Sequence, residues 1–315
     1  GIRDIGVTGV QTCALPIFTV DTAEHTRYRE PFEVPFRARE TERLFATSIR
    51  DYARELIGRM SSGDELTQGF AAPFAVGVAA QVIGLPLDDV RRIDSFYSAF
   101  AAAMEYTGDP EPLRRADQAR AELTALLLEG LGRSKVVEDS DLTPDEVAAQ
   151  LRVVMFGAIE TIQASVMTTL MLLIQHPEAM SAVRADRSLL TGAVDEGIRW
   201  MPPVAFIERW TSAPITLADV EIGEREFVGV SVLAANRDPE VFADPLTFDI
   251  RRPNARHGLS FSSGEHHCLG VHLARMQTVI ALEEMLDAWP TLELVSVTPP
   301  SGFAFRRPSD MVVAF

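Results

Sequence analysis

The sequence predicts a mainly helical α+β fold with small β-sheets, and three features indicate it. A long apolar segment with helical periodicity covers residues 144–175. A second such segment covers residues 269–289. From about residue 207 onward, short runs of β-branched and aromatic residues alternate with turn residues. Helices early in the chain and strands late in it favour one mixed domain.

The helical part begins with an amphipathic pattern over residues 43–60, with apolar side chains such as Ile49 and Leu56 on one face. The clearest helix starts at Pro144, because Thr143 can cap it and Glu146 completes a capping box. The pair His176-Pro177 should end this helix. About 30 residues at 1.5 Å each give roughly 45 Å, so this helix should cross the whole domain.

The strand-bearing part follows. Residues 207–211, 220–222 and 227–232 have the composition of short strands separated by turns. An irregular stretch rich in proline, aspartate and arginine then runs over residues 235–260. Short strands over residues 303–305 and 311–315 are expected to close the chain.

Composition excludes several classes of protein. The formal net charge is −16 and no basic run occurs, so we expect no nucleic-acid partner. The longest apolar stretch, residues 153–174, carries Glu160 and Gln163 near its middle. A charged group at the centre of a bilayer is costly, so we expect a buried helix and no membrane span. The two cysteines, Cys13 and Cys268, imply no disulfide framework.

The first 17 residues differ from the rest. Residues 7–17 resemble an in-frame translation of a common sequencing adapter, and their pattern does not continue into the following helix. We therefore expect residues 1–17 to be non-native and residues 18–315 to form a single domain. Cys268 would then be the only natural cysteine. The alternative is a natural loop.

A cysteine motif lies immediately before the second long helix. It contains Phe261, Gly264, His266, Cys268 and Gly270. The two glycines permit a tight turn and a close approach of the backbone to a flat ligand. A cysteine at a helix N-terminus faces backbone N–H donors and the positive end of the helix dipole, which favour the thiolate. Taken alone, such a cysteine is more often a buried residue in an ordinary loop.

The motif matches the pattern Phe-x-x-Gly-x-His/Arg-x-Cys-x-Gly at every fixed position, and the chain thereby resembles the cytochrome P450 superfamily, specifically its soluble bacterial haem-thiolate monooxygenases. The resemblance implies the cytochrome P450 fold, with Cys268 as the ligand of a haem b iron and Phe261, Gly264, His266 and Gly270 around the cofactor. In one departure, Ser262 stands where a glycine is often found.

Two further pairs resemble the family in the expected order. Glu160 and Thr161 lie midway along the first long helix, and the resemblance makes them the acid and alcohol that guide protons during dioxygen activation. The alternative for Thr161 is a hydroxyl bonded to the preceding turn. Glu196 and Arg199 resemble a buried family ion pair, which is expected to recruit Arg252 as a structural triad beneath the cysteine loop. Otherwise the pair would be ordinary surface charge.

A set of cations completes the resemblance. The two propionates of a haem need positive partners. His25 and Arg29 fall on one helical face, Arg209 follows Pro202-Pro203, and His266 lies two residues before the cysteine. The resemblance assigns all four to the propionates. Each of them singly could equally be surface charge.

The resemblance implies a cytoplasmic, monomeric monooxygenase that transfers one oxygen atom from O2 to a small organic substrate. The apolar residues Phe96, Phe100, Met104 and Phe206 favour an apolar substrate. Electrons should come from a separate acidic ferredoxin or flavodoxin. The arginines expected to dock it are Arg37, Arg252, Arg256 and Arg275. Because family members are longer at the N-terminus, we expect the N-terminal part of the domain to be lacking.

Two alternatives stay open at this stage. The chain could be a haem-thiolate protein without monooxygenase activity, namely a sensor or carrier, a peroxygenase or a dehydratase. The Glu160–Thr161 pair argues against this, since these functions need no proton relay to dioxygen. The other alternative is a zinc site formed by His266, His267, Cys268 and His272. Three consecutive residues cannot readily face one tetrahedral ion.

Overall fold

The computed structural model describes residue 17 and residues 20–104, 110–137 and 140–315. The calls on residues 1–16, including Cys13, therefore lie outside the described residues. The chain forms two compact units. The first contains the described residues up to Arg37 together with Val76–Gly157 and Glu208–Val228. The second contains Ala38–Ala75, Ala158–Ile207 and Gly229–Phe315. The predicted mainly helical α+β fold is confirmed.

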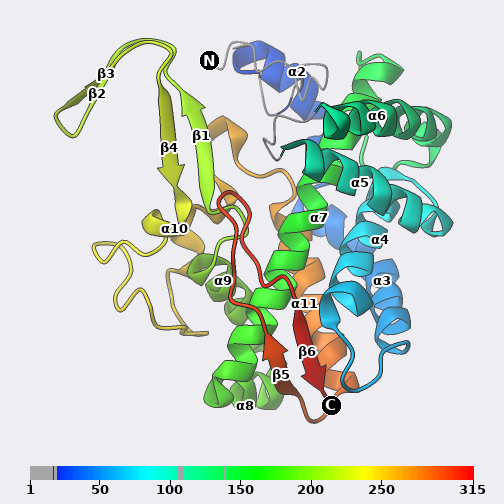
Figure 1. The fold of residues 1–315 in the computed structure, drawn as a ribbon, viewed down its shortest axis with the longest axis vertical. Helices are drawn as coiled ribbons and strands as arrows, with labels where there is room; N and C mark the ends of the chain where they lie inside the picture. The colour runs from blue at the N-terminus through cyan, green and yellow to red at the C-terminus, as the bar shows by residue number, and fades with distance from the viewer. Residues whose placement is uncertain (1–16, 18–19, 105–109, 138–139) are drawn as a thin grey trace. The chain divides into compact units, whose positions relative to one another are not determined.

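Helices dominate the first unit. They are α2 (Thr22–Glu33), most of α4 (Ala72–Ile83), α5 (Val90–Met104), α6 (Glu111–Gly130) and the first part of α7 (Pro144–Gln175). Helices α5 and α6 pack along each other (Figure 1). Tyr97 of α5 meets Phe156 of α7 with ring centroids 5.9 Å apart. Arg152 of α7 donates from Nη1 to Thr124 Oγ1 of α6 at 2.7 Å. Side chains of α7 thus hold the α5–α6 pair in this unit.

Helix α7 has the predicted bounds and the predicted cap. Thr143 N donates to Glu146 Oε2 at 2.7 Å, and Glu146 N donates to Thr143 Oγ1 at 3.3 Å. The helix is long and apolar enough to cross a membrane by length and composition, but 72% of its most apolar window is buried inside the protein. This burial is typical of a core helix. Arg27 Nη1 bonds Glu146 Oε1 at 2.8 Å, and this bond, together with the hydrogen bonds from Thr143, lowers the pKa of the Glu146 carboxyl to about 2.

The second unit is built on α3 (Ala38–Ile57) and α11 (Val271–Ala288), which pack against each other. Arg50 Nη2 bonds Glu283 Oε2 at 2.8 Å, and Arg54 Nε bonds Glu284 Oε2 at 2.7 Å. A π-helical turn (Thr67–Ala71) precedes α4. The other helices are α8 (Pro177–Ala185), α9 (Leu190–Trp200) and the short α10 (Val232–Ala235). Helix α9 packs on α11 and carries the charged residues described below.

The strands form three two-stranded sheets among the described residues. They are β1 (Phe206–Trp210) with β4 (Phe227–Ser231), β2 (Ile215–Leu217) with β3 (Val220–Ile222), and β5 (Glu293–Val297) with β6 (Met311–Ala314). Strands β1, β3, β4 and β6 lie within one or two residues of their predicted bounds, whereas β2 and β5 were not predicted.

The strand expected over residues 303–305 is wrong. Only Phe305 makes an isolated bridge, to Val204. Gly302 has a φ of +111°, and this left-handed conformation turns the chain before a strand can extend. The apolar alternation of Phe303 and Phe305 therefore belongs to a turn.

Helix α9 approaches the second half of α7 closely at Gly197. A Cβ atom on Gly197 would lie 2.5 Å from Thr169 Oγ1 and 3.4 Å from Thr169 Cα. Among the described residues, the buried Thr169 hydroxyl has no hydrogen-bond partner. Because Glu196 and Arg199 flank this contact on α9, the close approach sets the depth at which both charged groups are buried.

The contact predicts a specific loss of stability. Gly197→Ala should lower the free energy of unfolding by about 1–3 kcal/mol, since overpacking outweighs the roughly 1 kcal/mol gained in helix propensity. Thr169→Ala in the same chain should recover most of the loss, because it removes the clashing oxygen. Gly132→Ala is the matched control, since a Cβ there meets no atom within 4 Å. Urea unfolding measures all four proteins, and equal stability of the Gly197 and Gly132 variants would contradict the packing argument.

Candidate functional site

The cysteine loop is a series of tight turns that ends in a helix. One-turn 3-10 helices cover Leu259–Phe261 and Gly264–His266, and α11 begins at Val271, three residues after Cys268. Cys268 N donates to Phe261 O at 2.8 Å, and His267 N donates to Gly264 O at 3.0 Å. These bonds close the loop and bring the partly buried Cys268 beside the N-terminus of α11. Backbone N–H groups at such a position favour a thiolate.

Backbone conformation separates the roles of the small residues in this loop. Gly264 has a φ of +75°, which favours glycine. Gly270 has an ordinary φ of −83°, and a Cβ there would meet no atom of the described residues within 4 Å. Packing within the chain thus does not require glycine at position 270. Ser262 has φ 61° and ψ −167°, a region that is essentially restricted to glycine.

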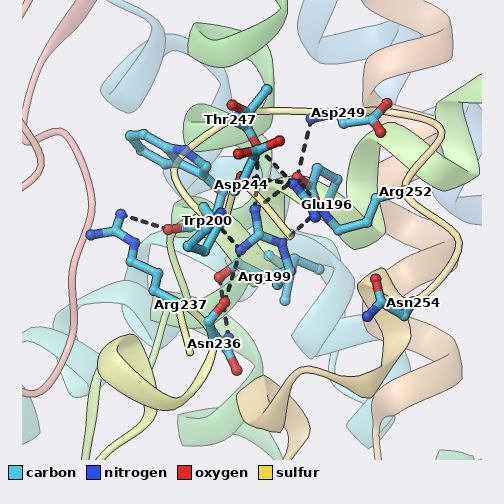
Figure 2. Close-up of polar contacts among 12 residues, drawn as sticks. Glu196, Arg199, Trp200, Asn236, Arg237, Asp244, Thr247, Asp249, Arg252 and Asn254 are labelled. Atoms are coloured by element: carbon cyan, nitrogen blue, oxygen red, sulfur yellow. Dashed lines mark hydrogen bonds and ion pairs between the residues drawn. The ribbon is translucent and has the colours of Figure 1, made fainter. Parts of the chain in front are cut away.

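A buried ion cluster lies on α9 (Figure 2). Both Glu196 oxygens accept from Arg199, from Nη2 and Nε, each at 2.7 Å. Arg252 Nε lies 3.0 and 3.1 Å from the same two oxygens. The side chains of Glu196 and Arg199 are fully buried and that of Arg252 is 6% exposed. The structure therefore brings together the three residues that the sequence analysis grouped.

The remaining donors of the two arginines bind main-chain carbonyls of residues 236–247. Arg199 Nη1 donates to Asn236 O at 2.8 Å and to Pro245 O at 3.0 Å. Arg252 Nη1 donates to Ala243 O at 2.6 Å. This segment has little regular structure of its own, so its carbonyls find no hydrogen-bond donors within a helix or sheet. The two arginines supply those donors. The cluster thereby fixes the path of the irregular stretch.

Asn236 links helix α9 to the cysteine loop by hydrogen bonds. Its Nδ2 donates to Arg199 O at 3.2 Å and to Ser260 Oγ at 2.8 Å, while its Oδ1 accepts from Leu259 N at 2.7 Å. Leu259 and Ser260 belong to the turn that ends at Phe261, whose carbonyl accepts from Cys268 N. A continuous set of hydrogen bonds therefore leads from α9 to the cysteine.

A second carboxylate of α9, Asp195, binds two further arginines. Arg275 Nε and Arg256 Nε lie 2.6 Å from its Oδ1 and Oδ2, respectively. The Arg275 guanidinium also lies over the Phe261 ring, 4.7 Å from its centroid. Arg252, expected among the docking arginines, is instead buried on Glu196. Arg252 was expected in both sets, and the docking expectation is wrong because only 6% of the side chain is exposed.

The predicted acid of the relay has a partner far away in the sequence. Arg307 Nε donates to Glu160 Oε1 at 2.6 Å, and the side chains are 23% and 17% exposed, respectively. Thr161 is partly buried, and its main-chain carbonyl accepts from Ser165 Oγ at 2.8 Å. Glu160, Thr161 and Cys268 all belong to the second unit. Their predicted roles stay predictions.

The predicted propionate cations are divided between the units. His25 and Arg29 lie one turn apart on α2 of the first unit. His25 is buried, and Arg29 Nε bonds Glu33 Oε1 at 3.1 Å. Arg209 is exposed on β1 in the same unit, whereas His266 belongs to the cysteine loop of the second. Their assignment as one set stays a prediction.

Sequence reasoning missed Asp195, Asn236 and Arg307. Asn236 begins the sequence Asn-Arg-Asp-Pro, which is typical of a turn. Nothing in that pattern predicts that its side chain bonds both α9 and the cysteine loop. The zinc alternative is not supported, because among the described residues no three His, Cys, Asp or Glu side chains are grouped so that they could hold a metal ion.

Comparisons with known proteins agree with this geometry. The family model Cytochrome P450 matches residues 90–301. Cytochrome P450 107B1 of Saccharopolyspora erythraea is 32% identical over 89% of this chain and 71% of its own length. Cytochrome P450 monooxygenase PikC of Streptomyces venezuelae is 30% identical over 93% and 72%. The structure of P450BioI in complex with hexadec-9Z-enoic acid ligated acyl carrier protein matches with a TM-score of 0.86 and 27% identity, over 96% and 82% of the two chains.

The cysteine motif, the helical fold and these similarities lead to one conclusion: the chain belongs to the cytochrome P450 family of haem-thiolate monooxygenases.

Proposed function

We propose that this chain inserts one oxygen atom of O2 into a small apolar organic molecule, with Cys268 as the ligand of a haem b iron. The observation that carries the proposal is the closed loop that brings Cys268 to the N-terminus of α11. A thiolate there is stabilised by nearby backbone N–H groups, and the same groups would tune a metal-bound sulfur.

The residues of the loop fit a flat cofactor. Neither backbone conformation nor packing demands a glycine at position 270. Its φ is ordinary, and a Cβ there meets no atom of the described residues within 4 Å. A planar ring close to the backbone would explain the glycine. His266 of the same loop would supply positive charge to a propionate, while His25, Arg29 and Arg209 of the first unit stay predicted partners. A haem-thiolate cofactor is therefore compatible with the residues present.

Bound haem would supply the activation of dioxygen. The chain would supply the proton path: the Glu160 carboxylate can accept and release a proton, and the neighbouring Thr161 hydroxyl can donate and accept a hydrogen bond. Both follow Gly157 on α7 and are partly buried, so water has limited access to them. This arrangement favours monooxygenase chemistry over a carrier or a peroxygenase.

The substrate and partners follow from residues outside the loop. Phe206 meets Phe303 with ring centroids 4.5 Å apart in the second unit, which favours an apolar substrate. The fatty acyl group in the P450BioI complex is consistent with this class. Electrons would come from a separate acidic ferredoxin or flavodoxin, and Arg256, whose side chain is 59% exposed, is one docking candidate. We expect a monomeric, cytoplasmic protein.

Replacement of the cysteine tests the proposal directly. Cys268→Ser should abolish the red-shifted Soret band of the reduced carbon monoxide complex, because only a thiolate ligand produces that band. Cys13→Ser changes the only other cysteine of the sequence and should leave the spectrum as in the original chain. Haem-loaded Cys268→Ser protein with an unchanged carbon monoxide spectrum would contradict the assignment. Circular dichroism establishes that the variant is folded.

The strained backbone at Ser262 gives a second test. Ser262→Gly should raise the free energy of unfolding by about 1 kcal/mol, because relief of roughly 1–3 kcal/mol of strain outweighs the entropy that glycine adds to the unfolded chain. Ser262→Ala is the matched control, since it removes the hydroxyl and keeps the strain. Urea unfolding distinguishes the two, and a glycine variant no more stable than the alanine variant would show that the loop is unstrained.

A further inference from the structure

Glu160 and Arg307 form an ion pair across 147 positions of sequence. Glu160 lies on α7 and Arg307 precedes β6, and both belong to the second unit. Arg307 Nε donates to Glu160 Oε1 at 2.6 Å, and Arg307 Nη1 donates to Pro308 O at 3.1 Å. With less than a quarter of either side chain exposed, the pair is screened less by solvent than a surface pair.

The chain that carries Arg307 is a closed turn. Ser301 N donates to Arg307 O at 3.1 Å, and Arg307 N donates back to Ser301 O at 3.4 Å. The Arg306 side chain stabilises the same turn, since its Nη1 and Nη2 donate to Gly302 O at 2.8 Å and Pro300 O at 2.9 Å. Gly302 permits the reversal through its φ of +111°. Arg307 is therefore presented from a fixed main chain.

The same turn is bonded to the segment after α9. Ala205 N donates to Ala304 O at 2.7 Å, and Arg306 N donates to Pro203 O at 3.0 Å. Phe303 packs on Phe206. The turn thus connects an apolar surface, formed by two phenylalanines, with the carboxylate on α7.

We propose that Arg307 is a positioning residue for Glu160: its guanidinium holds the carboxylate in one orientation beside Thr161. This inference rests on the proposed role of Glu160 in proton delivery. A carboxylate on a flexible side chain would otherwise be divided among several rotamers.

The two arginines of the turn provide an internal comparison. Arg306 bonds carbonyls of its own turn, whereas Arg307 bonds Glu160. Arg306→Gln therefore tests the fold of the turn, and Arg307→Gln tests the ion pair. Arg307→Lys retains the positive charge with a different shape and should restore part of the effect.

The experiment is a double-mutant cycle on haem-loaded protein. It compares the original chain, Glu160→Gln, Arg307→Gln and the double variant, with Arg306→Gln and Arg307→Lys alongside. The readout is hydrogen peroxide released per NADPH oxidised, with a surrogate ferredoxin and its reductase and no added substrate. Arg307→Gln should raise this ratio toward its limit of one peroxide per NADPH, because loss of a charge-assisted bond at a proton-transfer group diverts electrons from water to peroxide. The double variant should match Glu160→Gln, because Arg307 acts through that carboxylate.

A spectroscopic readout accompanies the cycle. The C–O stretching band of the reduced carbon monoxide complex reports the electric field beside the haem. Arg307→Gln should broaden or shift this band, and the double variant should again match Glu160→Gln.

The outcomes separate the inference from the function on which it rests. If Glu160→Gln leaves the peroxide ratio unchanged, the proposed role of Glu160 is wrong. If Glu160→Gln raises the ratio and Arg307→Gln does not, the role of Glu160 stands and the inference about Arg307 is overturned. If the effects of the two single changes are independent in the double variant, Arg307 does not act through Glu160 and the inference is overturned. An equal rise in Arg306→Gln would also overturn it, because the effect would then belong to the fold of the turn.

Discussion

The second unit depends on one buried carboxylate. Glu196 binds Arg199 of its own helix and Arg252 of the irregular stretch, and its Oε1 also accepts from Asp249 N at 3.1 Å (Figure 2). Removal of one member of such a cluster would leave buried charge uncompensated, which typically costs about 3–5 kcal/mol. A buried cluster is stabilising only when each arginine N–H group has an acceptor. Here the main-chain carbonyls of Asn236, Ala243 and Pro245 accept from the N–H groups that do not bind Glu196.

This arrangement explains how a stretch without regular structure can position a reactive sulfur. The arginines bind the carbonyls of residues 236–247, Asn236 binds the turn before Phe261, and Phe261 accepts from Cys268 N. Neighbouring Asp195 then binds Arg275, which covers the Phe261 ring. Two adjacent carboxylates on α9 thus support the cysteine loop from two sides. We propose that this support keeps the loop closed around the cofactor.

Local signals predicted the parts of the fold that local chemistry determines. Thr143, Pro144 and Glu146 predicted the start of α7 because capping involves residues only three positions apart. The strand over residues 303–305 was wrong because the conformation of Gly302 is not visible in an apolar alternation. The Glu160–Arg307 pair was missed because its partners are 147 positions apart. Arg252 was expected both in the triad and among the docking arginines, and only the folded chain shows that its side chain is buried against Glu196. The grouping of Glu196, Arg199 and Arg252 came from family resemblance, not from spacing.

The most direct measurement is hydrogen exchange of the main-chain amides of residues 236–262 in haem-loaded protein, with Arg199→Lys compared against the original chain. Lysine keeps the charge but cannot make the same set of bonds to Glu196 and the carbonyls. A loss of about 2 kcal/mol of local stability should speed exchange of amides such as Asp249 and Leu259 by roughly 30-fold, while amides of α3 stay unchanged. Unchanged exchange over residues 236–262 would contradict the account, because the segment would then be ordered without the Glu196 cluster.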